Sequence, residues 1–162
     1  RKEVGNDAAR FYYVMRKSEQ HINFDIDITV SQSKDNAVYY IQYANARICR
    51  MLEKAAATDV NFDAVNARQF AAKLDLDAET EILAKLAAYP EIVIRAANSY
   101  EPHQVGNYLK ELAALFHGWY NEHKVLNDDA ELTQARLLLS VNVQQVLRNG
   151  LELLGVSAPE SM

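Results

Sequence analysis

The sequence predicts an all-α protein: a helical bundle with a short helix and strand appended at its N-terminal end. Only five glycines and three prolines occur in 162 residues, which indicates long helices with few breaks. Apolar residues also recur at spacings of three and four over residues 36–57 and 102–125, the period of an amphipathic helix. The chain is long enough for one domain with a sizeable core.

The N-terminal appendage is predicted from a change of period. A first helix is expected from Asn6-Asp7, which serve as its N-cap, to about residue 17. Residues 22–30 then alternate strictly between apolar and polar, as a short half-buried strand does. We interpret residues 1–30 as the tail of a preceding region and residues 31–162 as the helical domain.

The helices of that domain follow from caps and breakers. They are expected at residues 35–57, 63–72 within a polar loop, 78–88, 91–99, 102–125 and 128–150. Asp35 or Asn36 caps the first of them. Asp128 and Glu131 form a capping box for the last, which is expected to end at Gly150.

Composition narrows the class of function. The net charge of −5 argues against a generic nucleic-acid binder, although residues 1–54 carry nine Lys or Arg against seven Asp or Glu. A single cysteine, Cys49, allows no internal disulfide, and no membrane span or signal peptide is recognisable, so a soluble cytoplasmic protein is expected. The sequence has no metal-ligand spacing, phosphate loop or nucleophile motif, so we predict no catalytic residue, metal or cofactor in this chain.

The helix at 36–57 carries two stripes. Its core stripe contains Ala37, Ile41, Ala44, Ile48, Met51, Leu52 and Ala55. Beside it, aromatic and basic residues follow one another at spacings of 3, 4, 3 and 4: Tyr40, Tyr43, Arg47, Arg50 and Lys54. Rings stack on unpaired bases and cations meet phosphates, so this stripe suits single-stranded RNA. The alternative is that the tyrosines only border the core and the cations are solvated.

The helix at 102–125 repeats this arrangement. Its core stripe contains Val105, Tyr108, Leu109, Leu112, Phe116 and Trp119. The adjacent polar face contains His117, Tyr120, Asn121 and Lys124. These side chains suit phosphate contact, base stacking and base-edge recognition, and they are equally compatible with an ordinary surface.

Several segments, taken in order, resemble the C-terminal part of arginyl-tRNA synthetases, over essentially the whole chain. They are residues 4–11, 24–27, 35–48, 116–121, 135–137 and 156–160, followed by the terminal Met162. The most specific is the Tyr-x-Gln-Tyr-Ala-x-Ala-Arg run at residues 40–47. Ala37, Asn45 and Ser161 stand where the family usually has proline, histidine and arginine, so we assign no role to Asn45 or Ser161.

The resemblance implies a helical bundle of the class Ia synthetase, DALR-type, anticodon-binding kind. The family attaches arginine to its tRNA with ATP and magnesium in an N-terminal catalytic domain. Both ATP-site signature motifs of the family are absent here, so the chain alone is expected to be inactive. The implied partners are the anticodon stem-loop of an arginine tRNA and the catalytic domain of the same protein, which is expected to be a monomer.

The resemblance also implies a site. Tyr40, Arg47, Tyr120 and Met162 match positions that surround the anticodon bases in the family. The full set of tRNA-binding residues that we predict is Tyr40, Tyr43, Arg47, Arg50, His117, Tyr120, Asn121, Arg136 and Met162. All arginine anticodons share a central C, so one pocket can serve every one of them. The alternative function is a helical protein-protein interaction module, because Tyr and Arg are also frequent at protein interfaces.

Overall fold

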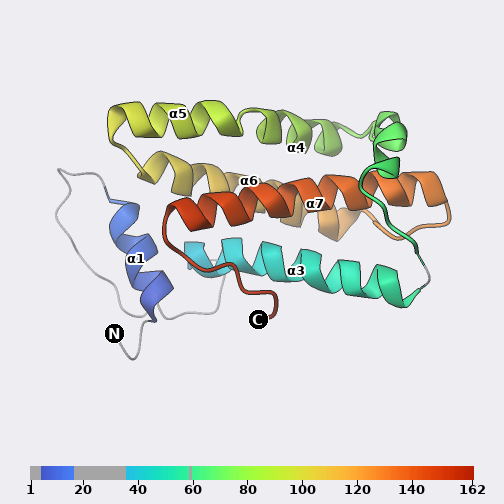
Figure 1. Ribbon diagram of the computed structural model, residues 1–162, viewed down its shortest axis with the longest axis horizontal. Helices are drawn as coiled ribbons and strands as arrows, with labels where there is room; N and C mark the ends of the chain where they lie inside the picture. The colour runs from blue at the N-terminus through green and yellow to red at the C-terminus, as the bar shows by residue number, and fades with distance from the viewer. Residues whose placement is uncertain (1–4, 17–35, 59) are drawn as a thin grey trace.

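The computed structural model describes residues 5–16, 36–58 and 60–162, and these residues form helices and connecting loops without a strand (Figure 1). The elements are α1 (Asn6–Val14), α3 (Ala37–Ala57), the 3₁₀ helix η1 (Asn66–Lys73), α4 (Asp77–Ala87), α5 (Tyr89–Ser99), α6 (His103–Glu122) and α7 (Ala130–Leu153). The predicted helical bundle is confirmed. The strand expected at 22–30 lies outside the described residues, and the boundary placed at residue 30 stays a prediction.

The three longest helices form the centre of the bundle. α3, α6 and α7 each pack against the other two, α4 and α5 cover a further side of α6, and η1 packs on the beginning of α7 (Figure 1). α1 lies across the ends of α3 and α6, where Phe11 enters the shared core. No helix in the described ranges is long and apolar enough to cross a membrane.

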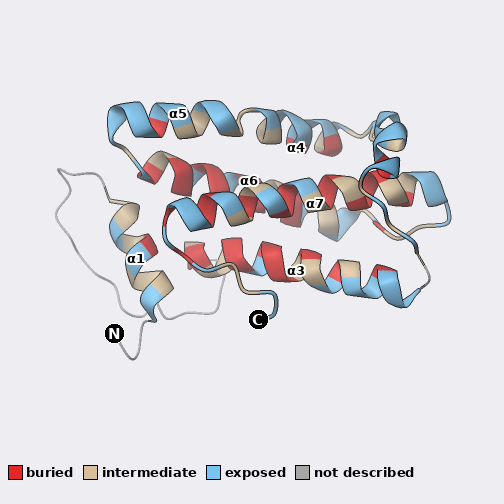
Figure 2. Cartoon of the chain, in the orientation of Figure 1, coloured by how far each residue is buried: buried red, intermediate tan, exposed pale blue. Residues whose placement is uncertain are grey.

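Buried side chains line the surfaces on which these helices face one another (Figure 2). All the core residues predicted on α6 are buried, as are Ile41, Ala44, Ile48, Met51 and Ala55 of α3. Ala37 and Leu52 are only partly buried at the border of the core. The helical period therefore predicted correctly which sides of α3 and α6 meet.

Two helix starts differ from the prediction. Asn36 does cap α3, with its side chain accepting from the backbone N–H of Tyr39 at 3.4 Å. The cap of α7, however, is Asp129 rather than Asp128. Its Oδ1 accepts from the backbone N–H groups of Glu131 and Leu132 at 3.0 and 3.1 Å. At α1 the carboxylate of Asp7 caps nothing, because it accepts hydrogen bonds from Gln42 and Ser157 instead.

The end of α7 was also predicted wrongly. The helix continues through Gly150. A Cβ at this position would lie 2.5 Å from the side chain of Leu109 on α6, so glycine leaves room for that side chain. Gly150 thus permits a close approach of two helices rather than a turn. The helix ends at Leu153, and Gly155 follows its C-cap with a φ of 66°, a left-handed conformation that favours glycine. The N–H groups of Gly155 and Val156 then bond back to Glu152 and Leu151, a Schellman motif.

Candidate nucleic-acid interface

Arg47 joins the polar faces of α3 and α6. Its Nη2 donates to Oδ1 of Asn121 at 2.6 Å, and its Nη1 lies 3.2 Å from Nδ1 of His117. The guanidinium carbon also lies 4.4 Å from the ring centroid of Tyr120 and 5.7 Å from that of Tyr43. The packing of α3 on α6 therefore brings together side chains that are 70 and 74 positions apart in the sequence.

Aromatic rings surround this guanidinium. The His117 ring lies 4.5 Å from that of Tyr40 and 5.5 Å from that of Tyr43, with an angle of 23° between the planes in the second pair. Tyr120 packs on the buried ring of Phe116 at 5.6 Å, which fixes it against the core. The Arg47 cluster is defined here as Tyr40, Tyr43, Arg47, His117, Tyr120 and Asn121.

The hydrogen bonds of His117 fix its neutral form. A guanidinium only donates, so Nδ1 of His117 accepts from Arg47, and Nε2 carries the proton and donates to the Tyr40 carbonyl at 3.2 Å. Burial lowers the pKa of His117 below its ordinary value of 6.5, and the charge of Arg47 acts in the same direction. The bond to the Tyr40 carbonyl opposes this shift without cancelling it. The imidazole is therefore a neutral support for Arg47.

The cluster has the chemistry of an anion and base-stacking site. Every group found in contact with the Arg47 guanidinium, among the described residues, is neutral, so no carboxylate compensates its charge. Tyr43 and Asn121 are exposed, while Tyr40, Arg47 and Tyr120 are partly exposed. Open rings beside an uncompensated cation suit stacked bases and their phosphates.

Two predicted site residues, Arg50 and Met162, are not part of the cluster. Arg50 is exposed on α3, three residues beyond Arg47 on the same side of the helix. Met162 is 44% exposed and takes part in none of the ring or polar contacts of the cluster. Its place in a shared pocket stays a prediction.

The C-terminal tail is folded back on the bundle. Asn45 donates to the carbonyls of Ala158 and Pro159 at 3.2 and 2.7 Å, and its own oxygen accepts from Arg148. Asn45 and Arg47 are two positions apart on α3, which corresponds to a rotation of about 200° around the helix axis. The side of α3 that holds the tail therefore faces away from Arg47. Asn45 is fully buried, and the sequence analysis had assigned it no role.

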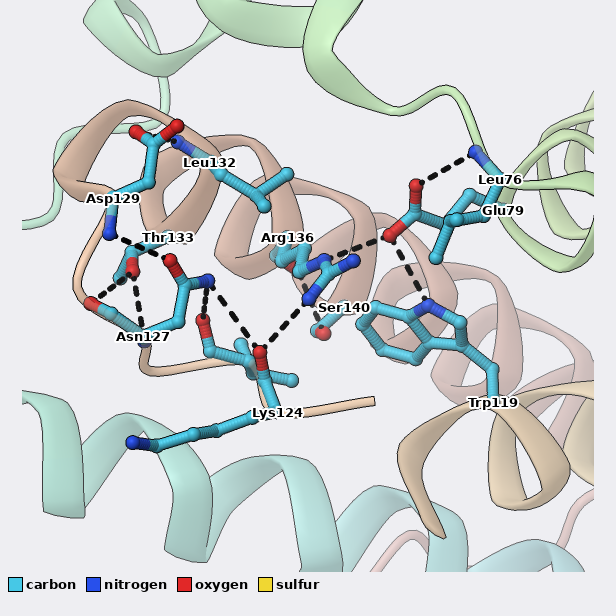
Figure 3. A network of polar contacts seen from close by, with 11 residues as sticks. Leu76, Glu79, Trp119, Lys124, Asn127, Asp129, Leu132, Thr133, Arg136 and Ser140 are labelled. Carbon is cyan, nitrogen blue, oxygen red and sulfur yellow. Dashed lines mark hydrogen bonds and ion pairs between the residues drawn. The ribbon is translucent and has the colours of Figure 1, made fainter. Parts of the chain in front are cut away.

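Arg136 lies apart from the cluster, in a buried network between α4, α6 and α7 (Figure 3). Its Nε donates to Oε1 of Glu79 at 2.8 Å, and its Nη1 donates to the carbonyl of Lys124 at 2.9 Å. Glu79 also accepts from the indole of Trp119 at 3.3 Å and from the N–H of Leu76, which starts α4. Arg136 was predicted to contact tRNA, but the residue is only 8% exposed and its guanidinium is already paired with Glu79, so its surroundings favour a structural role.

Glu79 was missed by the sequence analysis. The sequence analysis assigned it no role, yet it is completely buried. Glu79 lies three residues after Leu76, the N-cap of α4, where Glu commonly bonds back to the backbone. The helix was expected to begin at residue 78, so this spacing was not recognised.

The fold is that of the all-helical anticodon-binding domains of aminoacyl-tRNA synthetases. Residues 41–162 match the family described as the DALR anticodon binding domain, and the chain belongs to that family.

Two relatives that are similar in sequence to this chain are arginine–tRNA ligases. The chain is 85% identical over all 162 of its residues to an arginine–tRNA ligase of Acinetobacter baumannii (strain AYE), and covers 27% of that protein. It is 54% identical to an arginine–tRNA ligase of Psychrobacter sp. (strain PRwf-1), again over its full length and 28% of the relative. Among solved structures, the arginyl-tRNA synthetase of Thermus thermophilus superposes with a TM-score of 0.80 at 29% identity, over 99% of this chain and 27% of that one. The chain therefore spans about a quarter of these proteins' length.

Proposed function

We propose that this chain binds the anticodon stem and loop of an arginine tRNA and serves as the anticodon-binding part of an arginine–tRNA ligase. The observation that carries the proposal is the Arg47 cluster: a guanidinium held by neutral partners and surrounded by aromatic rings at the edge between α3 and α6. Membership of an anticodon-binding family and the names of the relatives support it.

The roles follow from the geometry of each side chain. Tyr43 and Tyr120 both lie close to the guanidinium and offer ring faces to unpaired bases. Arg47 and Arg50 provide positive charge for the phosphates that flank those bases. Asn121 offers an amide to a base edge beside them. Met162 belongs to the proposed set because it matches a position of the family's site.

The chemistry of the ligase belongs to the rest of the protein in this proposal. Attachment of arginine uses ATP and magnesium, and the signature motifs for ATP binding are absent from this chain. We expect the chain alone to catalyse no arginine-dependent exchange of pyrophosphate into ATP. Its partners are the tRNA and the catalytic part of the same polypeptide, and the protein acts as a monomer in the cytoplasm.

The direct test is binding to two RNA hairpins that differ at one base. An arginine anticodon stem-loop should bind more tightly than the same hairpin with its central C replaced, and log K should fall linearly with log salt concentration. Equal affinity for the two hairpins would contradict anticodon recognition. Absence of RNA binding, together with a salt-insensitive protein partner, would favour the protein-interaction alternative.

A further inference from the structure

A second concavity adjoins the Arg47 cluster and shares Tyr120 with it. This lysine-rimmed pocket has a volume of about 180 Å³ and is lined by Met51, Lys54, Tyr120, His123, Lys124, Val125 and Leu126. Met51 and Val125 are buried and give it an apolar floor. Lys54 approaches from α3, and the other cation comes from the loop that follows α6.

The loop wall of this pocket is built by the buried network. α6 ends at His123, whose extended backbone (φ −121°, ψ 129°) turns the chain toward α7. The next carbonyl, that of Lys124, accepts from Arg136 Nη1 at 2.9 Å and from Asn127 Nδ2 at 3.4 Å. The side chain of Lys124 extends away from this network (Figure 3). The ion pair of Arg136 with Glu79 thus holds one wall of the pocket in place.

The pocket is small, and its rim carries positive charge. The lining contains two lysines and a histidine but no Asp or Glu. Lys54 and Lys124 are both exposed and form no ion pair with any residue in the described ranges, so their charges are available. Pockets for drug-sized ligands measure roughly 300–1,000 Å³. A pocket of about 180 Å³ suits a single ring system rather than a whole nucleotide.

We propose that the lysine-rimmed pocket receives one unpaired base of the bound RNA, next to the base held at the Arg47 cluster, while Lys54 and Lys124 contact its flanking phosphates. The proposal rests on the RNA-binding function above and adds a separate subsite to it. Continuity supports it, because Tyr120 belongs to both places and a single strand crossing that ring passes from one to the other. An uncompensated cationic rim around an apolar floor is the combination that stacked single-stranded RNA needs.

The test uses the full-length protein that contains this chain and a set of arginine anticodon stem-loops, each abasic at one loop position. Leu126→Trp fills the pocket, because Leu126 is a partly exposed part of its lining. We expect this variant to bind the intact hairpin about tenfold more weakly. At the loop position whose base occupies the pocket, the abasic hairpin should bind the wild type more weakly than the intact hairpin does, but should bind the Leu126→Trp variant as well as the intact hairpin does. At every other position, the fold-loss caused by the missing base and the fold-loss caused by the substitution should multiply.

The charge of the rim is tested separately with Lys54→Ala and Lys124→Ala. Each should reduce the steepness of the plot of log K against log salt by about one, as expected for one lost phosphate contact. Arg95→Ala is the matched control, since Arg95 is exposed on α5, which packs on α4 and α6 rather than α3. Both lysines are solvent-exposed, so these variants remain informative if Leu126→Trp lowers the temperature of unfolding.

The pocket and the general function fail in different ways. If the wild type does not distinguish the central C, the proposed function fails. If it does, but Leu126→Trp binds every hairpin as the wild type does and the lysine variants leave the salt dependence unchanged, the pocket proposal is overturned alone. Losses that multiply at every loop position would also overturn it, because no base would then occupy the pocket.

Discussion

Arg47 and Arg136 were both predicted to contact RNA, and the structure gives them opposite surroundings. Arg47 lies at an edge of the bundle and bonds to an imidazole and an amide, both neutral. Arg136 lies inside and is paired with the carboxylate of Glu79, which is completely buried. The same side chain therefore has an available charge in one place and a compensated charge in the other.

The difference shows that partners, rather than residue type, decide what an arginine can do. A guanidinium that faces a carboxylate has little attraction left for a phosphate, and its burial makes it part of the scaffold. A guanidinium held in place by neutral acceptors is already ordered but keeps its full charge. Less side-chain freedom is then lost when an anion binds.

The largest effect is expected at the buried pair. Arg136→Ala leaves the Glu79 carboxylate buried without its charged partner, which typically costs about 3–5 kcal/mol in free energy of unfolding. Urea or thermal unfolding of the variant measures this loss. The double variant Arg136→Met with Glu79→Leu removes both charges and should recover part of the stability, because the N–H groups of Trp119 and Leu76 still lose their acceptor. A single variant as stable as the wild type would show that the pair does not hold α4 to α7.

The next largest effect is expected at the exposed rings. Tyr120→Ala removes a stacking surface worth roughly 1–3 kcal/mol per base, so the KM for tRNA of the full-length protein should rise by about 10- to 100-fold. The KM values for ATP and arginine should stay nearly constant. Tyr100→Ala is the control, because that ring is 92% exposed at the end of α5. Equal effects of the two variants would argue against stacking on Tyr120.

A smaller effect is expected when Arg47 is replaced. Arg47→Ala should weaken RNA binding and reduce the slope of log K against log salt by about one. Arg47→Lys keeps the charge, so it should restore the slope, but an ammonium lacks the planar fork that holds His117 and Asn121 together. Salt titrations of the three proteins separate charge from geometry. An unchanged slope in Arg47→Ala would exclude a phosphate contact there.

The smallest effect is expected from the titration of His117. Because its pKa is lowered in the folded protein, the unfolded chain binds the proton more readily, and the stability falls as the pH drops through and below 6.5. Protonation also makes Nδ1 a donor that faces Arg47. His117→Gln cannot titrate, so its free energy of unfolding should change less between pH 7.5 and 5.5 than that of the wild type. An equal change in both proteins would place the pH dependence elsewhere.

Much of the fold followed from local rules. Periodicity predicted the helices and the core sides of α3 and α6, because the direction of each side chain depends only on its number along the helix. The six residues of the Arg47 cluster were all selected from the two polar faces that this period defines. Their function in RNA binding stays a prediction, as does the inclusion of Met162.

The sequence by itself thus determined the helical class, the positions of the long helices and the residue types on each of their faces. Only the tertiary structure decided which polar residues are paired: Glu79 with Arg136, 57 positions later, and Asn45 with the tail, 113 positions later. It also decided that Gly150 permits a helix contact while Gly155 follows the end of the helix. The physical reason is that hydrogen bonding along a helix is local, whereas the partner of a buried charge depends on how distant helices cross.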